Sequence, residues 1–129
     1  MNPPMHKRVS ALLVSAGLTA GYTIQSLIWT DTGDLAERFI VVRPNGGGDI
    51  DQDAGAEYYI LVDLVTAKST GEIAKSEADV QSIIEYVKAN PITDPCVGQI
   101  RNMGGIPTPI QTTEGRLVWR LQFSCLYGE

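Results

Sequence analysis

The stretch Glu57–Lys68, EYYILVDLVTAK, is the longest strand candidate in the chain. One set of alternating positions holds Tyr58, Ile60, Val62 and Leu64, and most of the positions between them are apolar too. A strand that is apolar on both faces usually lies in the centre of its sheet or is covered by a helix. We therefore expect the rest of the sheet to be built outward from this strand.

A second strand is predicted just before it, at Phe39–Arg43. Pro44 should end that strand because proline has no N–H group to donate to a ladder. Asn45–Gly48 then provides a flexible connection, and an antiparallel hairpin is the simplest way to join the two strands. The β-branched and aromatic content of Tyr22–Trp29 predicts one more strand nearer the N-terminus.

The C-terminal half predicts a helix and a closing strand. Apolar residues recur at helical spacing in Ser76–Asn90, with Ser76 as the expected N-cap. Pro95–Gln99 is expected to be a short strand, and Arg101–Glu114, rich in Gly, Pro and Thr, a long loop. Alternating apolar residues in Gly115–Leu126 predict the last strand of the sheet.

The order of these elements predicts an α+β fold, an antiparallel β-sheet with helices packed on one face. A chain of 129 residues is the length of one domain, so we expect a single α+β domain over residues 1–129. Residues 1–21 are predicted to be its N-terminal helix, with a flexible start. Val9, Leu12 and Leu13 form an apolar stripe there, and Gly17 is the expected C-terminal cap.

The N-terminus also has features of a secretory signal, with basic residues before an apolar stretch that ends in small residues. The stretch is too short to span a bilayer. In this alternative, the chain is an exported small α+β binding domain that loses about 20 residues on cleavage and carries a Cys96–Cys125 disulfide. Two widely spaced cysteines do not form a zinc motif, and two reduced thiols are the simpler interpretation.

Charge and composition exclude several classes of function. Ten basic and fifteen acidic residues give a net charge of -5, which argues against specific nucleic-acid binding. His6 is the only histidine, so a Ser or Cys nucleophile has no positioned second base. The composition therefore points away from an enzyme, and no motif indicates a cofactor.

One acidic motif, Asp49-x-Asp51-x-Asp53, begins like a calcium-binding loop. Ala54 occupies the sixth position, where such loops need glycine, and the glutamate of the twelfth position is also missing. We therefore interpret the motif as a solvated acidic loop without a metal.

Four segments occur in a familiar order. They are Gly33–Gly47 (GDLAERFIVVRPNGG), Tyr58–Asp63 (YYILVD), the helix Ser76–Asn90, and Leu117–Ser124 (LVWRLQFS). In order and texture they resemble phage and prophage tail terminator proteins of the lambda type, which are minor tail proteins. The resemblance covers Thr23–Tyr127.

The resemblance implies a non-enzymatic virion assembly protein that forms a ring, usually a hexamer. Such a ring caps the tail tube, stops its polymerisation and presents the surface that joins the head. Its partners would be copies of itself, the tail tube protein and the head–tail connector proteins, with no membrane and no cofactor. The protein would act in the cytoplasm of the bacterial host and end in the virion tail.

Particular residues follow only from this resemblance. Two loops are expected to contact neighbouring subunits or the tube: Arg43, Asn45, Gly46 and Gly47, and Arg101, Asn102 and Met103. The acidic loop with Asp49, Asp51 and Asp53 is expected to face a lumen through which DNA passes, where like charge limits sticking.

Overall fold

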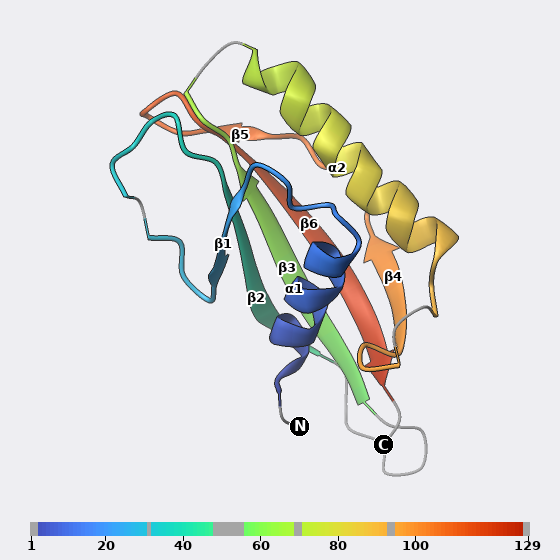
Figure 1. Ribbon diagram of the computed structural model, residues 1–129. Helices are drawn as coiled ribbons and strands as arrows, with labels where there is room; N and C mark the ends of the chain where they lie inside the picture. Colours follow the sequence, from blue (N-terminus) through green and yellow to red (C-terminus); the bar gives the residue numbers. More distant parts are fainter. Residues whose placement is uncertain (1–2, 31, 48–55, 69–70, 93–94, 128–129) are drawn as a thin grey trace.

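The computed structural model describes residues 3–30, 32–47, 56–68, 71–92 and 95–127. In this part of the chain, two helices lie on a six-stranded mixed sheet (Figure 1). The elements are α1 (Met5–Ser15), β1 (Thr23–Ser26), β2 (Phe39–Gly47), β3 (Ala56–Val65), α2 (Glu72–Ala89), β4 (Gln99–Met103), β5 (Ile110–Gln111) and β6 (Leu117–Tyr127). The strand order is β1-β2-β3-β6-β4, and β5 also pairs with β6. The α+β prediction is confirmed.

Strand β3 is central in the sheet, as its sequence predicts. It pairs antiparallel with β2 on one side and along its full length with β6 on the other. Both of its faces are buried around the middle of the strand, with Ile60 and Val62 on one face and Leu61 and Asp63 on the other. The predicted hairpin of β2 and β3 is therefore confirmed.

The sheet is not wholly antiparallel, because β1 runs parallel to β2. The connection 27–38 carries the chain back to the end of the sheet at which β1 began, so β2 starts beside Thr23 and runs the same way. A parallel pair needs about a dozen residues or more for this return, and the connection is of that length. Short-range turn chemistry cannot reveal such a crossover.

The main core lies between the two helices and one face of the sheet. Buried residues of α1, α2, β2, β3, β4 and β6 form a single cluster there. The members from the four strands are Ile40, Val42, Ile60, Val62, Leu64, Ile100, Trp119, Leu121, Phe123 and Cys125. Both helices lie on the same side of the sheet (Figure 1), which confirms the predicted packing on one face.

Helix α2 begins at Glu72, so the prediction that Ser76 caps it was wrong. Ser76 is buried inside the helix, and its hydroxyl accepts a hydrogen bond of 2.9 Å from the indole N–H of Trp119. Glu72 instead accepts the backbone N–H of Ala67 and pairs with Arg38. These contacts are long-range, which explains why the local capping pattern misplaced the helix start.

The structure also corrects the N-terminal predictions. Helix α1 ends at Ser15, and turns occupy residues 16–21, with Gly17 in the left-handed region at a φ of 75°. The side chains of Val9, Leu12 and Leu13 lie in the core. Since the core depends on α1, loss of the first 20 or so residues by signal cleavage would expose it to water.

The Cys96–Cys125 disulfide is wrong, because both cysteines are free. Cys125 lies opposite Ile100 in the sheet and points into the core, while Cys96 is exposed in the turn before β4. Burial raises the pKa of the Cys125 thiol to about 12. This thiol therefore stays protonated and packs as a small apolar side chain.

Candidate interaction surface

The second face of the sheet carries no helix, since both helices lie on the other side (Figure 1). At one end, Trp29 and Val118 pack on Phe39, Val41 and Val65. We call the remainder the open face. By register it comprises Arg43, Tyr59, Leu61, Asp63, Arg101, Met103, Arg120, Gln122 and Ser124. Arginine, tyrosine and methionine are the residue types enriched at protein interfaces.

A buried carboxylate organises the charges of the open face. Asp63 receives a bidentate contact from Arg120, at 3.0 Å to Oδ1 and 3.1 Å to Oδ2. A second guanidinium, that of Arg43, lies 2.9 Å from the same Oδ2. The hydrogen bonds with Asp63 raise the pKa of Arg120 above its ordinary value. Two arginines on one carboxylate leave a net positive charge fixed in place on this face.

The sheet brings together predicted contact residues from two distant segments. One row across the strands contains Arg43, Leu61, Gln122 and Met103. The next row contains Arg101 beside Ser124. Directly paired residues share a face of the sheet, so Arg43, Arg101 and Met103 all belong to the open face.

The predicted loop at Arg101–Met103 is in fact the edge strand β4, so that part of the loop prediction was wrong. Asn102 pairs with Phe123 and points to the helix side. Its Oδ1 is buried without a hydrogen-bond partner, beside a hollow of about 340 Å³ that Val87 and Pro91 also line. Asn102 is thus separated from Arg101 and Met103 by the sheet itself.

The predicted loop at Asn45–Gly47 is the exposed end of β2, because the strand continues past Pro44. The pairing shifts register between Pro44 and Gly47, which lets a proline occupy the strand. A Cβ on Gly47 would lie 2.2 Å from the carbonyl oxygen of Glu57, so only glycine fits there. Asp49, Asp51 and Asp53 lie outside the described residues.

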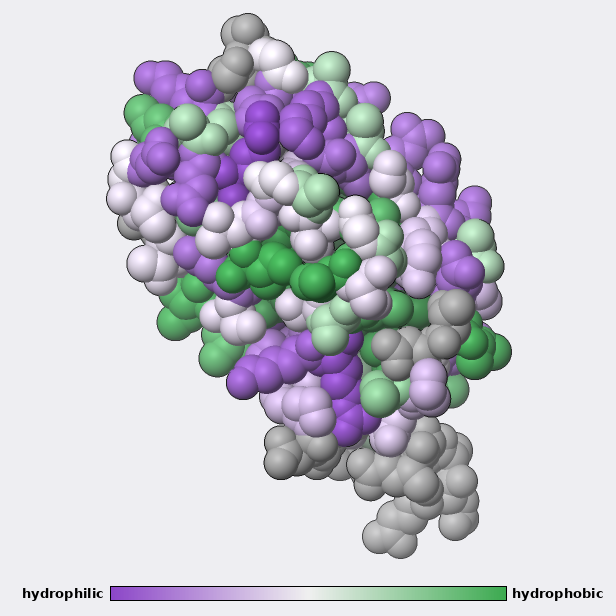
Figure 2. Space-filling view, in the orientation of Figure 1, coloured by the Kyte–Doolittle hydropathy of each residue, from purple (hydrophilic) through white to green (hydrophobic). Residues whose placement is uncertain are grey.

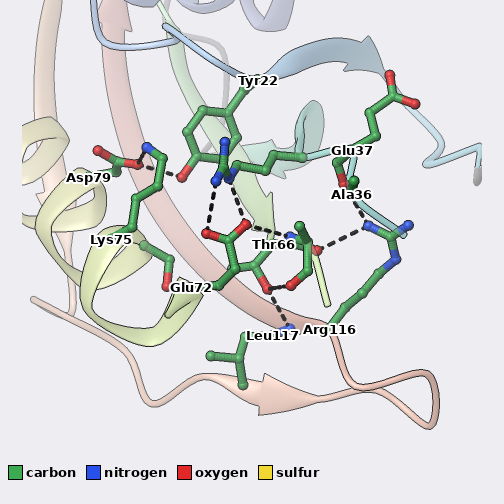
Figure 3. A network of polar contacts seen from close by, with 12 residues as sticks. Tyr22, Ala36, Glu37, Thr66, Glu72, Lys75, Asp79, Arg116 and Leu117 are labelled. Atoms are coloured by element: carbon green, nitrogen blue, oxygen red, sulfur yellow. Dashed lines mark hydrogen bonds and ion pairs between the residues drawn. The ribbon is translucent and has the colours of Figure 1, made fainter. Parts of the chain in front are cut away.

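The densest polar network of the molecule lies elsewhere, where α2 meets the end of β3. Figure 3 shows Tyr22, Lys75 and Asp79 on one side of Glu72 and Thr66 with Arg116 on the other. The hydroxyl of Tyr22 donates to Asp79 at 2.6 Å, and Lys75 lies 2.8 Å from the same carboxylate. Burial, followed by the bond to Asp79, raises the pKa of Tyr22 above its usual range. A tyrosine held protonated in ion-paired surroundings suits a structural role.

Arg116 is the most deeply buried charge of this network, with an exposed fraction of 0%. Its guanidinium donates to the carbonyls of Asp34, Glu37 and Thr66 at 2.6 to 3.0 Å. It also lies against the rings of Trp29 and Phe39. Arg116 therefore fastens the connection 27–38 to the sheet. Nothing in the sequence marks it except its position at the start of the closing strand.

The described residues contain no group of three or more His, Cys, Asp or Glu side chains placed to hold a metal ion. His6 is buried against the core, and burial, with a smaller contribution from Lys7, lowers its pKa below 6.5. Among the described helices, neither is long and apolar enough to cross a membrane. The polar groups of this molecule thus serve packing and surface recognition.

A comparison with protein families decides what this surface serves. The model of the family described as phage tail termination protein matches residues 2–129. The chain belongs to that family. The resemblance seen in the four sequence segments is thereby confirmed, and the match also includes the N-terminal helix. No curated protein matches the chain.

Membership of the tail termination family makes the chain a structural protein of phage tail assembly. Its contacts are with other tail proteins, and its place is the tail of the virion. In such a protein, a sheet face without a covering layer is a surface available for contact. The open face is therefore the candidate interaction surface of this tail termination protein.

Proposed function

We propose that the protein caps the end of the tail tube as a ring, stops addition of tube subunits and presents the surface that joins the head. The proposal is carried by the family match over residues 2–129. The ring, a hexamer of identical subunits, assembles in the cytoplasm of the bacterial host and remains in the virion tail. Its partners are the tail tube protein and the head–tail connector proteins.

The open face is the surface that meets the tube or a neighbouring subunit in this proposal. Arg43, Arg101 and Met103 supply charge and flexible apolar contact, and the pairing of Arg43 with Asp63 fixes the position of its guanidinium before contact. The exposed end of β2, with Asn45, Gly46 and Gly47, extends this surface, and Asn102 contributes from the helix side of β4.

The acidic residues Asp49, Asp51 and Asp53 face the lumen of the ring in this proposal. The connection that contains them carries no basic residue between Arg43 and Lys68. Like charge would keep DNA from adhering to the wall during its passage. Replacing all three by Asn should leave ring formation intact and increase DNA retention by the isolated ring at low salt.

Tube length is the direct test of capping. The tail tube protein of the same phage is polymerised with and without this protein, and lengths are measured by electron microscopy. We expect shorter tubes with a ring at one end. Arg43→Ala should weaken capping at least about tenfold, since truncating a central interface residue costs ~2 kcal/mol. Lys75→Ala, on the helix side, is the matched control. Unchanged tube lengths with the unaltered protein would overturn the proposal.

A further inference from the structure

The two outer edges of the sheet both carry exposed apolar side chains. At the β1 edge, which we define as residues 23–37, these are Leu27, Ile28 and Leu35, and Ile28 is 74% exposed. Figure 2 shows apolar side chains at the margin of the molecule where β1 ends. At the opposite edge, residues 99–113, which we call the β4–β5 edge, they are Met103, Ile106 and Ile110. Each edge is a small apolar patch that no other element of the described chain covers.

The charges of the two edges are opposite in sign. Every charged residue of the β1 edge is acidic: Asp31, Asp34 and Glu37. The β4–β5 edge contains one charged residue, Arg101, and Lys88 of α2 lies beside it around the same hollow. Opposite potentials favour contact between unlike edges and disfavour contact between like ones.

Long intermolecular strand pairing is restricted at both edges. Strand β1 has only four residues, and the carbonyl of Ser26 already accepts the N–H of Ile28. In β4 the outward N–H of Ile100 donates to the carbonyl of Pro91. A contact at these edges must therefore be made largely by side chains, which are the exposed apolar ones.

Leu27 adds an independent sign that the β1 edge is shaped for contact. Its φ is 70°, and it is the only described residue other than glycine with a positive φ. Its N–H is still bonded to the carbonyl of Val42, yet half of its surface faces solvent. Backbone strain that holds a leucine in the open is typical of binding segments.

We propose that the β1 edge of one copy docks on the β4–β5 edge of the next copy. The contact joins two different patches at opposite ends of the sheet, so it is heterologous and closes into a ring when the rotation between copies permits. The inference deepens the proposed ring and rests on it. Self-pairing of the β1 edge is disfavoured because it would bring Asp34 and Glu37 against their own copies.

Site-specific cross-linking tests the proposal in the full-length protein. In a Cys96→Ser background, Ile28→Cys and Ile106→Cys variants are prepared separately and mixed with a short bismaleimide. The buried Cys125 does not react. We expect a covalent dimer in the mixture and none with either variant alone, whereas the double variant should give a ladder of covalent oligomers. Val14→Cys, on the outside of α1 and 50% exposed, replaces one partner in the control mixture.

A substitution provides the second readout. Ile106 is 52% exposed in the single copy, so Ile106→Asn should leave the thermal unfolding of the monomer unchanged. Self-association measured by sedimentation should weaken about tenfold, the effect of losing one buried aliphatic side chain from an interface. Val14→Asn is matched in exposure and should leave self-association unchanged.

The outcomes separate this inference from the proposed function. Rings in the microscope without the Ile28–Ile106 cross-link overturn the assignment of edges and leave the capping ring standing. Cross-linking of the Ile106→Cys variant with itself shows a two-fold contact and also overturns the assignment. Absence of any ring or self-association, with or without tubes, overturns both.

Discussion

Arg116→Met is expected to be among the most destabilising single changes in the molecule. The substitution keeps an apolar stem of similar length between Trp29 and Phe39 but removes three hydrogen bonds to backbone carbonyls. Each buried carbonyl left without a donor costs ~1 kcal/mol or more. The loss of stability should therefore be ~3 kcal/mol, offset in part because methionine avoids the burial of a charge.

Urea unfolding followed by tryptophan fluorescence measures this loss. Arg101→Met, at an exposed position, is the control and should change stability by no more than ~0.5 kcal/mol. Arg116→Lys retains the charge without the fork of donors, so it should recover only part of the stability. A loss below ~1 kcal/mol for Arg116→Met would refute the role of Arg116 as the fastening of the connection 27–38.

Three further changes test other parts of the structure. Ser76→Ala leaves the buried indole N–H of Trp119 without its acceptor and should lower the unfolding free energy by ~1 to 3 kcal/mol, measured in urea. Gly47→Ala places a Cβ against the carbonyl of Glu57 and should lower the melting temperature by at least ~4 °C. Because the pKa of His6 is lowered on folding, the unfolded chain binds more protons below pH 6.5. Stability should therefore fall as the pH drops from about 6.5 to about 5, by at most ~1.4 kcal/mol per pH unit, and His6→Asn should remove this slope.

Each of these predictions has a matched comparison. Ser82 is an exposed serine of the same helix, and Ser82→Ala should be nearly neutral. A Cβ on Gly104 would meet no atom within 4 Å, so Gly104→Ala should show backbone strain alone. Equal losses at Gly47 and Gly104 would contradict the steric argument. A pH slope that persists without His6 would assign it to the carboxylates instead.

Local patterns in the sequence predicted the parts of the fold that depend on alternation. The apolar residues on both faces of Glu57–Val65 correctly indicated a central strand, and the alternation in Leu117–Tyr127 its long partner. The stripe of Val9, Leu12 and Leu13 likewise identified a packed helix at the N-terminus. In these segments the pattern of burial is written directly in the order of residue types.

Elements that depend on distant contacts were missed. The first turn of α2 is held by Glu72, whose partners Arg38 and Ala67 come from other elements. The parallel placement of β1 depends on the connection fastened by Arg116, which is distant in sequence. In such places tertiary contacts override the local preference for a turn or a cap.

The candidate surface was predicted in part. The resemblance to tail terminators directed attention to Arg43 and to Arg101 and Met103, but it placed them on loops. Gly104 and Gly105 gave that segment the texture of a loop, and only the register with β6 shows that residues 99–103 form a strand. Asp63 was not singled out because an acidic residue inside an apolar strand has meaning only beside its two arginines.

Negative-stain microscopy combined with light scattering on concentrated, full-length protein tests the central claim most directly. The account predicts rings with six-fold symmetry and a central hole, and a scattering mass to match, increased by the presence of tail tubes. A protein that remains a monomer at high concentration, and adds no ring to the ends of tubes, would contradict it.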